Sequence, residues 1–262
     1  MSHIYLLLII FTEQICMIAI SSILGFAIAA ITIAVAAWVL PKKTGNKNII
    51  TVLLIGIGAM SLALIVQSIA QQVPYLYLFA SLKSISAASS KYVALEKAYP
   101  ILIAAFLGIM AGFWQELAKF FSVRYFKHFD APWVGFGFAV VDISIFLFGL
   151  LPGLSASAKE IAAVSAISFI GIALQSPFSM MFHTGTAAYL KSGSEKKKPL
   201  KNFLVAFLAH SYVDGALAYA DIAVVLLGFS FFYSELLVWI PAMAIAFAFL
   251  LYLRAYVKDS RR

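Results

Sequence analysis

Long apolar runs, separated by short polar segments, dominate the pattern along this chain. Several runs reach about 20 residues, the length that a helix needs to cross the hydrocarbon core of a bilayer. They cover residues 18–40, 49–70, 99–125, 132–151, 161–190, 202–220 and 236–257. Membrane β-strands would instead show alternating hydrophobicity over about 10 residues. The pattern therefore predicts membrane-spanning α-helices.

Shorter stretches leave the number of spans open. Residues 4–17 predict either a further span or a helix at the membrane interface, and residues 222–233 either extend the preceding span or re-enter the membrane. Residues 71–98 have an amphipathic character, and we expect an external loop there. The fold class predicted is all-α, a polytopic bundle of about seven to eight spans. We expect residues 1–262 to form a single membrane domain.

Composition excludes a water-soluble protein. Of the 262 residues, 63% are hydrophobic and 11% are charged, against about 45–50% apolar and about 25% charged in soluble domains. In hydrocarbon, only helices and closed barrels satisfy their backbone polar groups. The single cysteine, Cys16, lies in an apolar run, which excludes an intrachain disulfide and a thiolate metal site.

The net charge of +8 could indicate a nucleic-acid partner, but the positions of the basic residues favour a membrane protein. Cytoplasmic loops of membrane proteins carry an excess of Lys and Arg. If residues 41–48 are cytoplasmic, so are 126–131, 191–201 and the C-terminal tail. These segments and the adjoining helix ends hold Lys42, Lys43, Lys47, Arg124, Lys127, Lys191, Lys196, Lys197, Lys198, Lys201, Arg254, Lys258, Arg261 and Arg262; the opposite side holds Lys83, Lys91, Lys97 and Lys159. We predict a multi-pass protein of the cell membrane with a cytoplasmic C-terminus and no nucleic-acid partner.

Ionisable residues within the predicted spans are the strongest indication of function. Such residues are expensive in a bilayer and commonly mark functional sites. They lie on the helices near 99–125, 132–151, 161–190 and 202–220, and they are Glu116, Lys119, Asp142, His183, His210 and Asp214.

The depth of these residues predicts one common site. Glu116, Asp142, His183 and His210 each lie about eight to ten residues from the cytoplasmic end of their helix, roughly 12–15 Å inside the membrane. Two of these helices run inward and two run outward, so chain order does not force the agreement. If the helices pack together, the side chains form one polar layer.

The residue types in this layer suit amide hydrolysis. Two imidazoles and a carboxylate are a common ligand set for catalytic Zn²⁺, which makes His183, His210 and Glu116 candidate ligands of a divalent metal. Without a metal, a carboxylate could act as a general base on water, with the histidines as a second base or as oxyanion donors. Lys119 is expected to pair with Glu116 or to extend towards the cytoplasmic boundary.

Other interpretations of the layer stay open. Polar residues also join membrane helices by hydrogen bonds, and Asp214 could simply orient His210. Intramembrane acids and histidines build proton pathways in transporters as well. The chain shows no inverted repeat and no pair of Gly/Pro-broken helices of the kind that transporters use.

Short motifs in the chain resemble those of a known group. AGFWQELAKFF at 111–121 resembles the EExx(K/R) helix of the YhfC and PrsW families of intramembrane metalloproteases, relatives of the CAAX-processing proteases. GFGFAVVDI at 135–143 is similar to their second motif, and FHTGTAAYL at 182–190 and LAHSYVDG at 208–215 are similar to their two histidine helices. The order and spacing agree over most of the chain, and the layout looks closest to the YhfC type. The resemblance implies cleavage of a peptide bond in a membrane-protein or lipidated-peptide substrate.

The resemblance also implies roles for single residues. It places motif positions at Glu116, Lys119, Asp142, His183, His210 and Asp214. Gln115, however, stands where these families have their first glutamate, which is the water-activating base of the related enzymes. A glutamine cannot take a proton from water. Either Glu116 or Asp142 substitutes for that base, or the chain is a non-catalytic relative that binds membrane or lipidated peptides.

Overall fold

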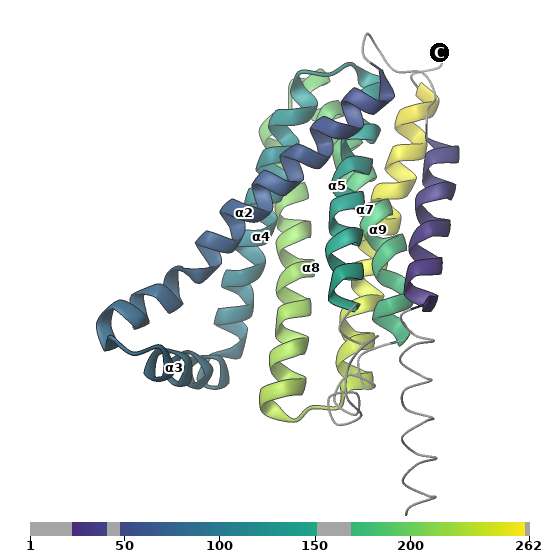
Figure 1. The fold of residues 1–262 in the computed structure, drawn as a ribbon. Helices are drawn as coiled ribbons and strands as arrows, with labels where there is room; N and C mark the ends of the chain where they lie inside the picture. Colours follow the sequence, from purple (N-terminus) through teal and green to yellow (C-terminus); the bar gives the residue numbers. More distant parts are fainter. Residues whose placement is uncertain (1–22, 41–47, 151–168, 260–262) are drawn as a thin grey trace, which may run out of the picture.

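The computed structural model describes residues 23–40, 48–150 and 169–259 (Figure 1), and over these ranges every regular element is a helix. A first helix, Ile23–Val39, precedes the labelled ones. The others are α2 (Ile49–Leu82), α3 (Ile85–Ala98), α4 (Pro100–Arg124), the short 3₁₀ helix η1 (His128–Asp130), α5 (Ala131–Leu150), α7 (Phe169–Glu195), α8 (Pro199–Leu227) and α9 (Phe231–Asp259). The stretch 4–17 and parts of the predicted spans 18–40 and 161–190 lie outside the described residues.

Five described helices are long and apolar enough to cross a membrane: α2, α4, Ala131–Phe148 of α5, α8, and Leu236–Lys258 of α9. The predicted class, an all-α membrane bundle, is thereby confirmed. Helix α7 is equally long, with 27 residues, but it carries more polar side chains. It packs against α5, α8 and α9, so its polar residues face other helices.

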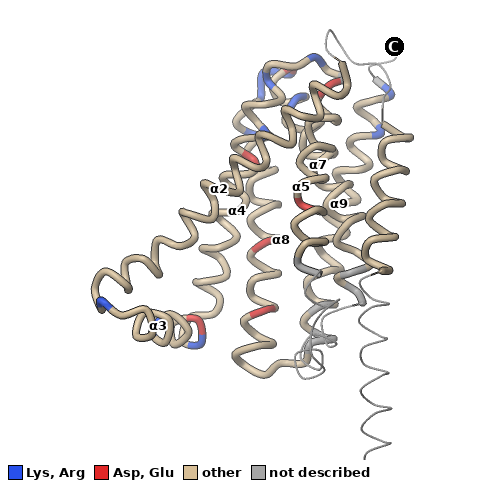
Figure 2. Tube along the Cα trace, in the orientation of Figure 1, with Lys and Arg blue, Asp and Glu red and all other residues tan. Residues whose placement is uncertain are grey.

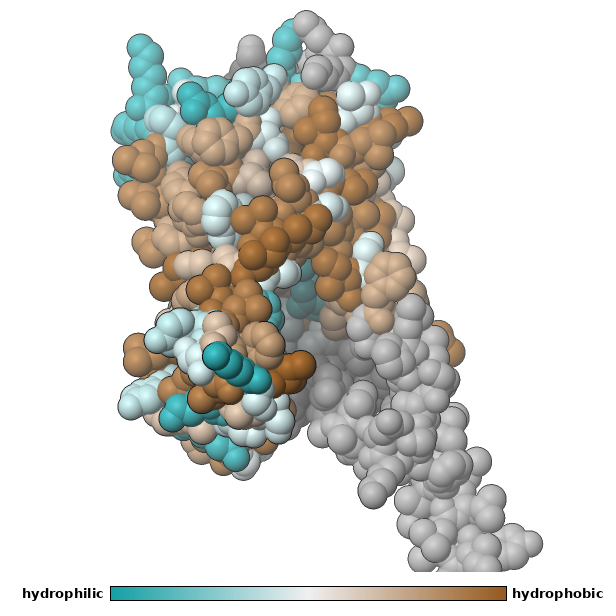
Figure 3. All heavy atoms as spheres, turned by 60° about the vertical axis from the view of Figure 1, so that its left-hand side comes forward, coloured by the Kyte–Doolittle hydropathy of each residue, from teal (hydrophilic) through white to brown (hydrophobic). Residues whose placement is uncertain are grey.

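The outer surface is the kind that lipid covers. Large apolar side chains on α2, such as Leu62, Ile65 and Ile69, are exposed. Figure 3 shows apolar side chains spread over the middle of the visible face, with hydrophilic side chains gathered at its upper end. Soluble monomers rarely expose continuous apolar patches larger than a few hundred Å².

The external loop expected over residues 71–98 is instead helical. Helix α2 continues through Pro74 to Leu82 and ends at Lys83, whose backbone is left-handed with φ 51°. Ser84 then caps α3, accepting a hydrogen bond from the Ala87 backbone N–H at 3.3 Å. The amphipathic pattern belongs to a helix that lies across one end of the bundle (Figure 1).

The stretch 222–233 extends the helices on either side of it. Helix α8 runs on to Leu227 and ends at Gly228, whose φ of 72° is the left-handed conformation that glycine adopts without a steric penalty. Helix α9 begins three residues later, at Phe231. The stretch was expected either to extend the preceding span or to re-enter the membrane, and the structure shows the extension.

The basic segments meet at one end of the bundle, as Figure 2 shows. His128, which lies between α4 and α5, contacts the ends of α7 and α9. Its Nδ1 lies 2.9 Å from Glu195 Oε2 at the end of α7, and its Nε2 lies 3.3 Å from the Tyr256 carbonyl oxygen near the end of α9. The segments 126–131 and 191–201 and the end of α9 therefore lie together.

Glycines allow the helices that carry the polar residues to touch. A Cβ on Gly108 of α4 would overlap the Ser211 carbonyl oxygen and the backbone of Gly215 in α8. A Cβ on Gly135 of α5 would overlap the His183 carbonyl oxygen of α7. Such close backbone approach at small residues is typical of membrane bundles, and here it brings α4 against α8 and α5 against α7.

Two glycines on α2 give a matched test of this packing. A Cβ on Gly56 would overlap the Val134 carbonyl oxygen of α5, whereas Gly58 has nothing within 4 Å. We expect Gly56→Ala to lower the free energy of unfolding by about 1–3 kcal/mol, because backbone must move. Gly58→Ala should change it by less than about 1 kcal/mol. Thermal unfolding in detergent measures both, and equal effects would contradict the assigned α2–α5 contact.

Candidate functional site

The predicted polar residues of α4, α5, α7 and α8 meet in one cluster. Figure 2 shows acidic residues partway along α4, α5 and α8, away from the charged helix ends. Continuous contacts, none longer than 3.8 Å, connect Glu116, Lys119, Asp142, His183, His210 and Asp214. The predicted convergence of these side chains is what the structure has.

Glu116 and Lys119 form the centre of the cluster. Lys119 Nζ lies 2.6 Å from Glu116 Oε1, and both side chains are 0% exposed. The same oxygen lies 2.7 Å from His210 Nδ1 on α8. Glu116 Oε2 is buried and has no hydrogen-bond partner among the described residues. One carboxylate oxygen thus joins α4 to α8.

Lys119 joins α4 to α7. Its Nζ lies 2.8 Å from Thr186 Oγ1 and 3.0 Å from His183 Nδ1. The rings of Phe138 and Phe182 flank the ammonium, with centroids at 5.2 Å and 5.6 Å from Nζ, within the range of cation–π attraction. Of the two expectations for Lys119, pairing with Glu116 is the one realised, and the side chain does not extend to the membrane boundary.

These contacts assign opposite tautomers to the two histidines. An ammonium has three donors and no acceptor, so His183 Nδ1 accepts from Lys119 and the proton of the neutral ring is on Nε2. A carboxylate only accepts, so His210 Nδ1 donates to Glu116, and Nε2 of the neutral ring carries a lone pair. One Nε2 atom is therefore a donor and the other an acceptor.

Each Nε2 atom lies near an aspartate that is partly exposed. His183 Nε2 lies 3.8 Å from Asp142 Oδ2, and His210 Nε2 lies 3.5 Å from Asp214 Oδ2. The aspartate side chains are 27% and 28% exposed, against 2% and 5% for their histidines. The gap between His210 Nε2 and Asp214 Oδ2, both acceptors, suits a water that donates one hydrogen to each.

Gln115 does not take part in this network. Its Nε2 donates to Gln67 Oε1 on α2 at 2.9 Å. The residue at the position of the first motif glutamate thus pairs with another glutamine, and among the described residues it makes no hydrogen bond to Glu116 or to either histidine.

Sequence reasoning missed three partners in and around the cluster: Gln67, Thr186 and Gln175. Gln175 Nε2 donates to Asp142 Oδ2 at 3.4 Å. Thr186 follows His183 by one helical turn, and that spacing was the available signal. No spacing links Gln67 to Gln115, because the two lie on different helices.

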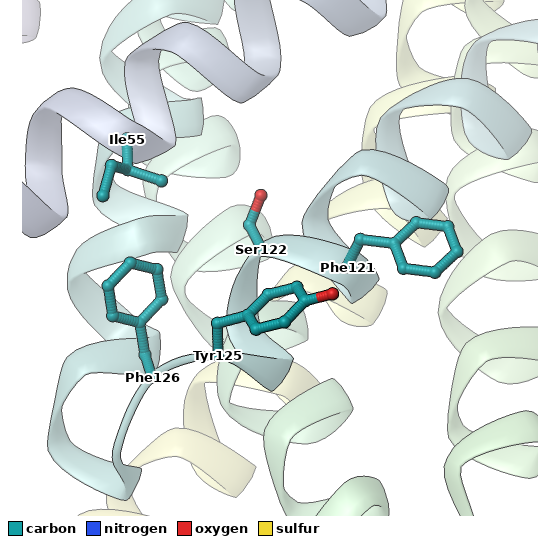
Figure 4. A pocket seen from close by; sticks show the side chains of 5 residues that line it. All are labelled: Ile55, Phe121, Ser122, Tyr125 and Phe126. Carbon is teal, nitrogen blue, oxygen red and sulfur yellow. The ribbon is translucent and has the colours of Figure 1, made fainter.

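A separate pocket lies beside the end of α4, lined by Ile55, Phe121, Ser122, Tyr125 and Phe126 (Figure 4). It includes none of the cluster residues. The Ser122 hydroxyl donates to the Ala118 carbonyl oxygen at 2.8 Å, so this side chain is already satisfied. The cluster remains the candidate functional site.

The cluster geometry does not fit a divalent metal bound by Glu116, His183 and His210. Glu116 Oε1 already accepts from Lys119 and His210, and His183 Nδ1 faces an ammonium. Within the described ranges, no group of three or more His, Cys, Asp or Glu side chains is arranged to hold a metal ion. The zinc expectation stays a prediction that metal analysis would test.

Fold and site together define a helical membrane protein with a buried, hydrogen-bonded cluster of acids, histidines and one lysine. No family model matches the chain, and neither a curated protein nor a solved structure matches it. The resemblance to the YhfC and PrsW families thus rests on the motifs alone.

The central ion pair predicts a non-additive stability change. Glu116→Gln leaves the Lys119 ammonium buried without its counter-ion, and we expect it to lower the free energy of unfolding by about 3–5 kcal/mol. The double variant Glu116→Gln/Lys119→Met removes both charges and should recover at least about half of that loss. Thermal unfolding in detergent measures both variants.

Glu195 provides the matched control, because it forms the partly exposed ion pair with His128. Glu195→Gln should change the free energy of unfolding by only about 0–1 kcal/mol. A double variant that is no more stable than Glu116→Gln would show that the buried pair does not act as a unit.

Proposed function

We propose that this protein is a membrane hydrolase that cleaves a peptide bond of a membrane-embedded or lipidated peptide, with His210 as general base and His183 as oxyanion donor. One arrangement carries the proposal: two adjacent histidines, to which their Nδ1 partners assign opposite tautomers, each have Nε2 next to a partly exposed aspartate. Their ring centroids are 5.4 Å apart, so one peptide group can contact both.

The first step is attack by water. A water held between His210 Nε2 and Asp214 Oδ2 gives a proton to His210 as its oxygen bonds to the substrate carbonyl carbon. The carbonyl oxygen gains negative charge and accepts a hydrogen bond from His183 Nε2–H. Such a donor, fixed in place before the reaction, stabilises the developing charge.

The second step is loss of the amine. The His210 imidazolium donates its proton to the substrate nitrogen, the C–N bond breaks, and the carbonyl fragment becomes a carboxylic acid. Glu116, which accepts from His210 Nδ1 at 2.7 Å, stabilises the imidazolium between the two steps. This role needs an ionised carboxylate but no proton transfer to it.

Lys119, Glu116 and Asp142 act on the histidines and are positioning residues. Lys119 holds the His183 proton on Nε2, and Glu116 holds the His210 proton on Nδ1. Asp142 lies 3.8 Å from His183 Nε2 and supports the same ring orientation. In this arrangement the base is a histidine, so Gln115 does not prevent hydrolysis.

The apolar helices around the cluster support a substrate that lies in the cell membrane. The cluster lies within helices whose outer faces are apolar, so a segment already in the bilayer reaches it without crossing water. We place the basic end of the bundle, and with it the C-terminus, in the cytoplasm, because cytoplasmic loops are rich in Lys and Arg.

The histidine mechanism predicts which substitutions abolish cleavage. We expect membranes that contain the wild-type protein to yield new peptide N-termini, detected by mass spectrometry. His210→Ala should remove them, because it removes the base. His183→Ala should lower their rate of formation by about 10²–10³-fold, the effect of removing one oxyanion donor.

His128→Ala is the matched control, since His128 lies at the basic end of the bundle outside the cluster, and cleavage should persist in it. Unchanged cleavage in His183→Ala and His210→Ala would defeat the site assignment. Activity that arises only in Gln115→Glu would identify the chain as a non-catalytic relative that binds peptides.

The orientation predicts where a thiol is accessible. In a Cys16→Ala background, we expect Lys91→Cys on α3 to react with a membrane-impermeant maleimide in intact cells. Lys196→Cys, beyond the end of α7, should react only after permeabilisation. Both lysines are exposed, so burial does not explain a difference. The reverse labelling pattern would place the C-terminus outside.

A further inference from the structure

We propose that Lys119 is a built-in cation that takes the place of a metal ion, so that the wild-type cluster excludes metal and loss of the ammonium converts it into a divalent-metal site. The inference rests on the geometry of the cluster and is independent of the hydrolysis proposed above.

Three different ligand types converge on the Lys119 ammonium. Around Nζ lie Glu116 Oε1 at 2.6 Å, Thr186 Oγ1 at 2.8 Å and His183 Nδ1 at 3.0 Å. A carboxylate oxygen, an imidazole nitrogen and a hydroxyl oxygen therefore direct lone pairs to one point. Lone pairs converging on a point are what a cation site provides, whether the cation is an ammonium or a metal.

The ammonium excludes a second cation for two reasons. Its three protons occupy the lone pairs that a metal would need. Its charge also repels a divalent ion, and this repulsion is strong because the side chain is fully buried and unscreened. Lys119 is covalently attached to α4, so it does not leave by dissociation as a metal ion does.

The donor set indicates which metals would enter in its absence. Nitrogen and oxygen ligands with an open position suit Zn²⁺ and its spectroscopic substitute Co²⁺. Metal–ligand bonds are about 2.0–2.2 Å, so the three groups would move inward by less than about 1 Å each. Glu116 Oε2, which is buried without a partner among the described residues, supplies a further oxygen.

The experiment compares metal binding by purified full-length variants in detergent. Lys119→Ala removes the ammonium and leaves space for an ion. We expect it to bind one Co²⁺ per chain, with visible absorption, more than about 100-fold tighter than the wild type, because the ammonium no longer occupies the ligands and no longer repels the ion. In the wild type, elemental analysis should find no stoichiometric metal.

A second substitution tests the assigned ligands. Lys119→Ala/Glu116→Gln lacks the carboxylate and should bind Co²⁺ at least about 10-fold more weakly than Lys119→Ala, the range seen when one supporting group of a metal site is removed. Equal affinity in both variants would place the ion elsewhere and overturn the proposal.

The melting temperature of the variant provides a second measurement of metal binding. If Lys119→Ala unfolds readily, added Co²⁺ or Zn²⁺ should raise its melting temperature while leaving the wild type unchanged, because ligands stabilise the state that binds them. A variant that neither ion stabilises or binds would overturn the proposal. Stoichiometric metal in the wild type would overturn it as well, whether or not the protein hydrolyses peptides.

Discussion

The ion pair between Lys119 and Glu116 is the interaction on which the rest of this structure depends. An ammonium inside a membrane protein is stable only if its charge is balanced and its protons are accepted. Lys119 obtains one acceptor from its own helix and two from α7, and Glu116 receives a second donor from α8. The pair thereby fixes how α4, α7 and α8 lie around one point.

Because the buried Lys119 ammonium needs acceptors from neighbouring helices, those helices must lie close together. Hydrogen bonds of 2.6–3.0 Å form only if the helix backbones approach closely, and glycines make this possible. Gly108 and Gly112 of α4 face the backbone around Ser211 and Gly215 of α8. The glycines allow the helices to approach, and the charged residues then form hydrogen bonds across the contact. The cluster therefore depends on both groups of residues.

The sequence predicted that the polar side chains of four helices would meet, but it did not predict most of the contacts among them. Depth follows from a constant rise per residue and from Lys and Arg at the helix ends, so the convergence of Glu116 with His210 could be expected. The contacts of Lys119 with His183 and Thr186 depend on the rotation of α7 about its axis, which the sequence does not specify. The helical nature of residues 71–98 was missed because Pro74 and the preceding glutamines look like a helix end, although α2 continues through them.

The position of Gln115 shows that the partner of each side chain, and not the motif alone, determines what the cluster can do. In the motif comparison, this residue removes the expected base and favours a non-catalytic protein. In the structure it faces Gln67 of α2, while the carboxylate one residue later orients His210. Consecutive helical residues point about 100° apart, so exchanging the acid for an amide at one position leaves the neighbouring face intact. In the proposed mechanism, catalysis by this cluster therefore depends on the protonation of two histidines, which Lys119 and Glu116 set.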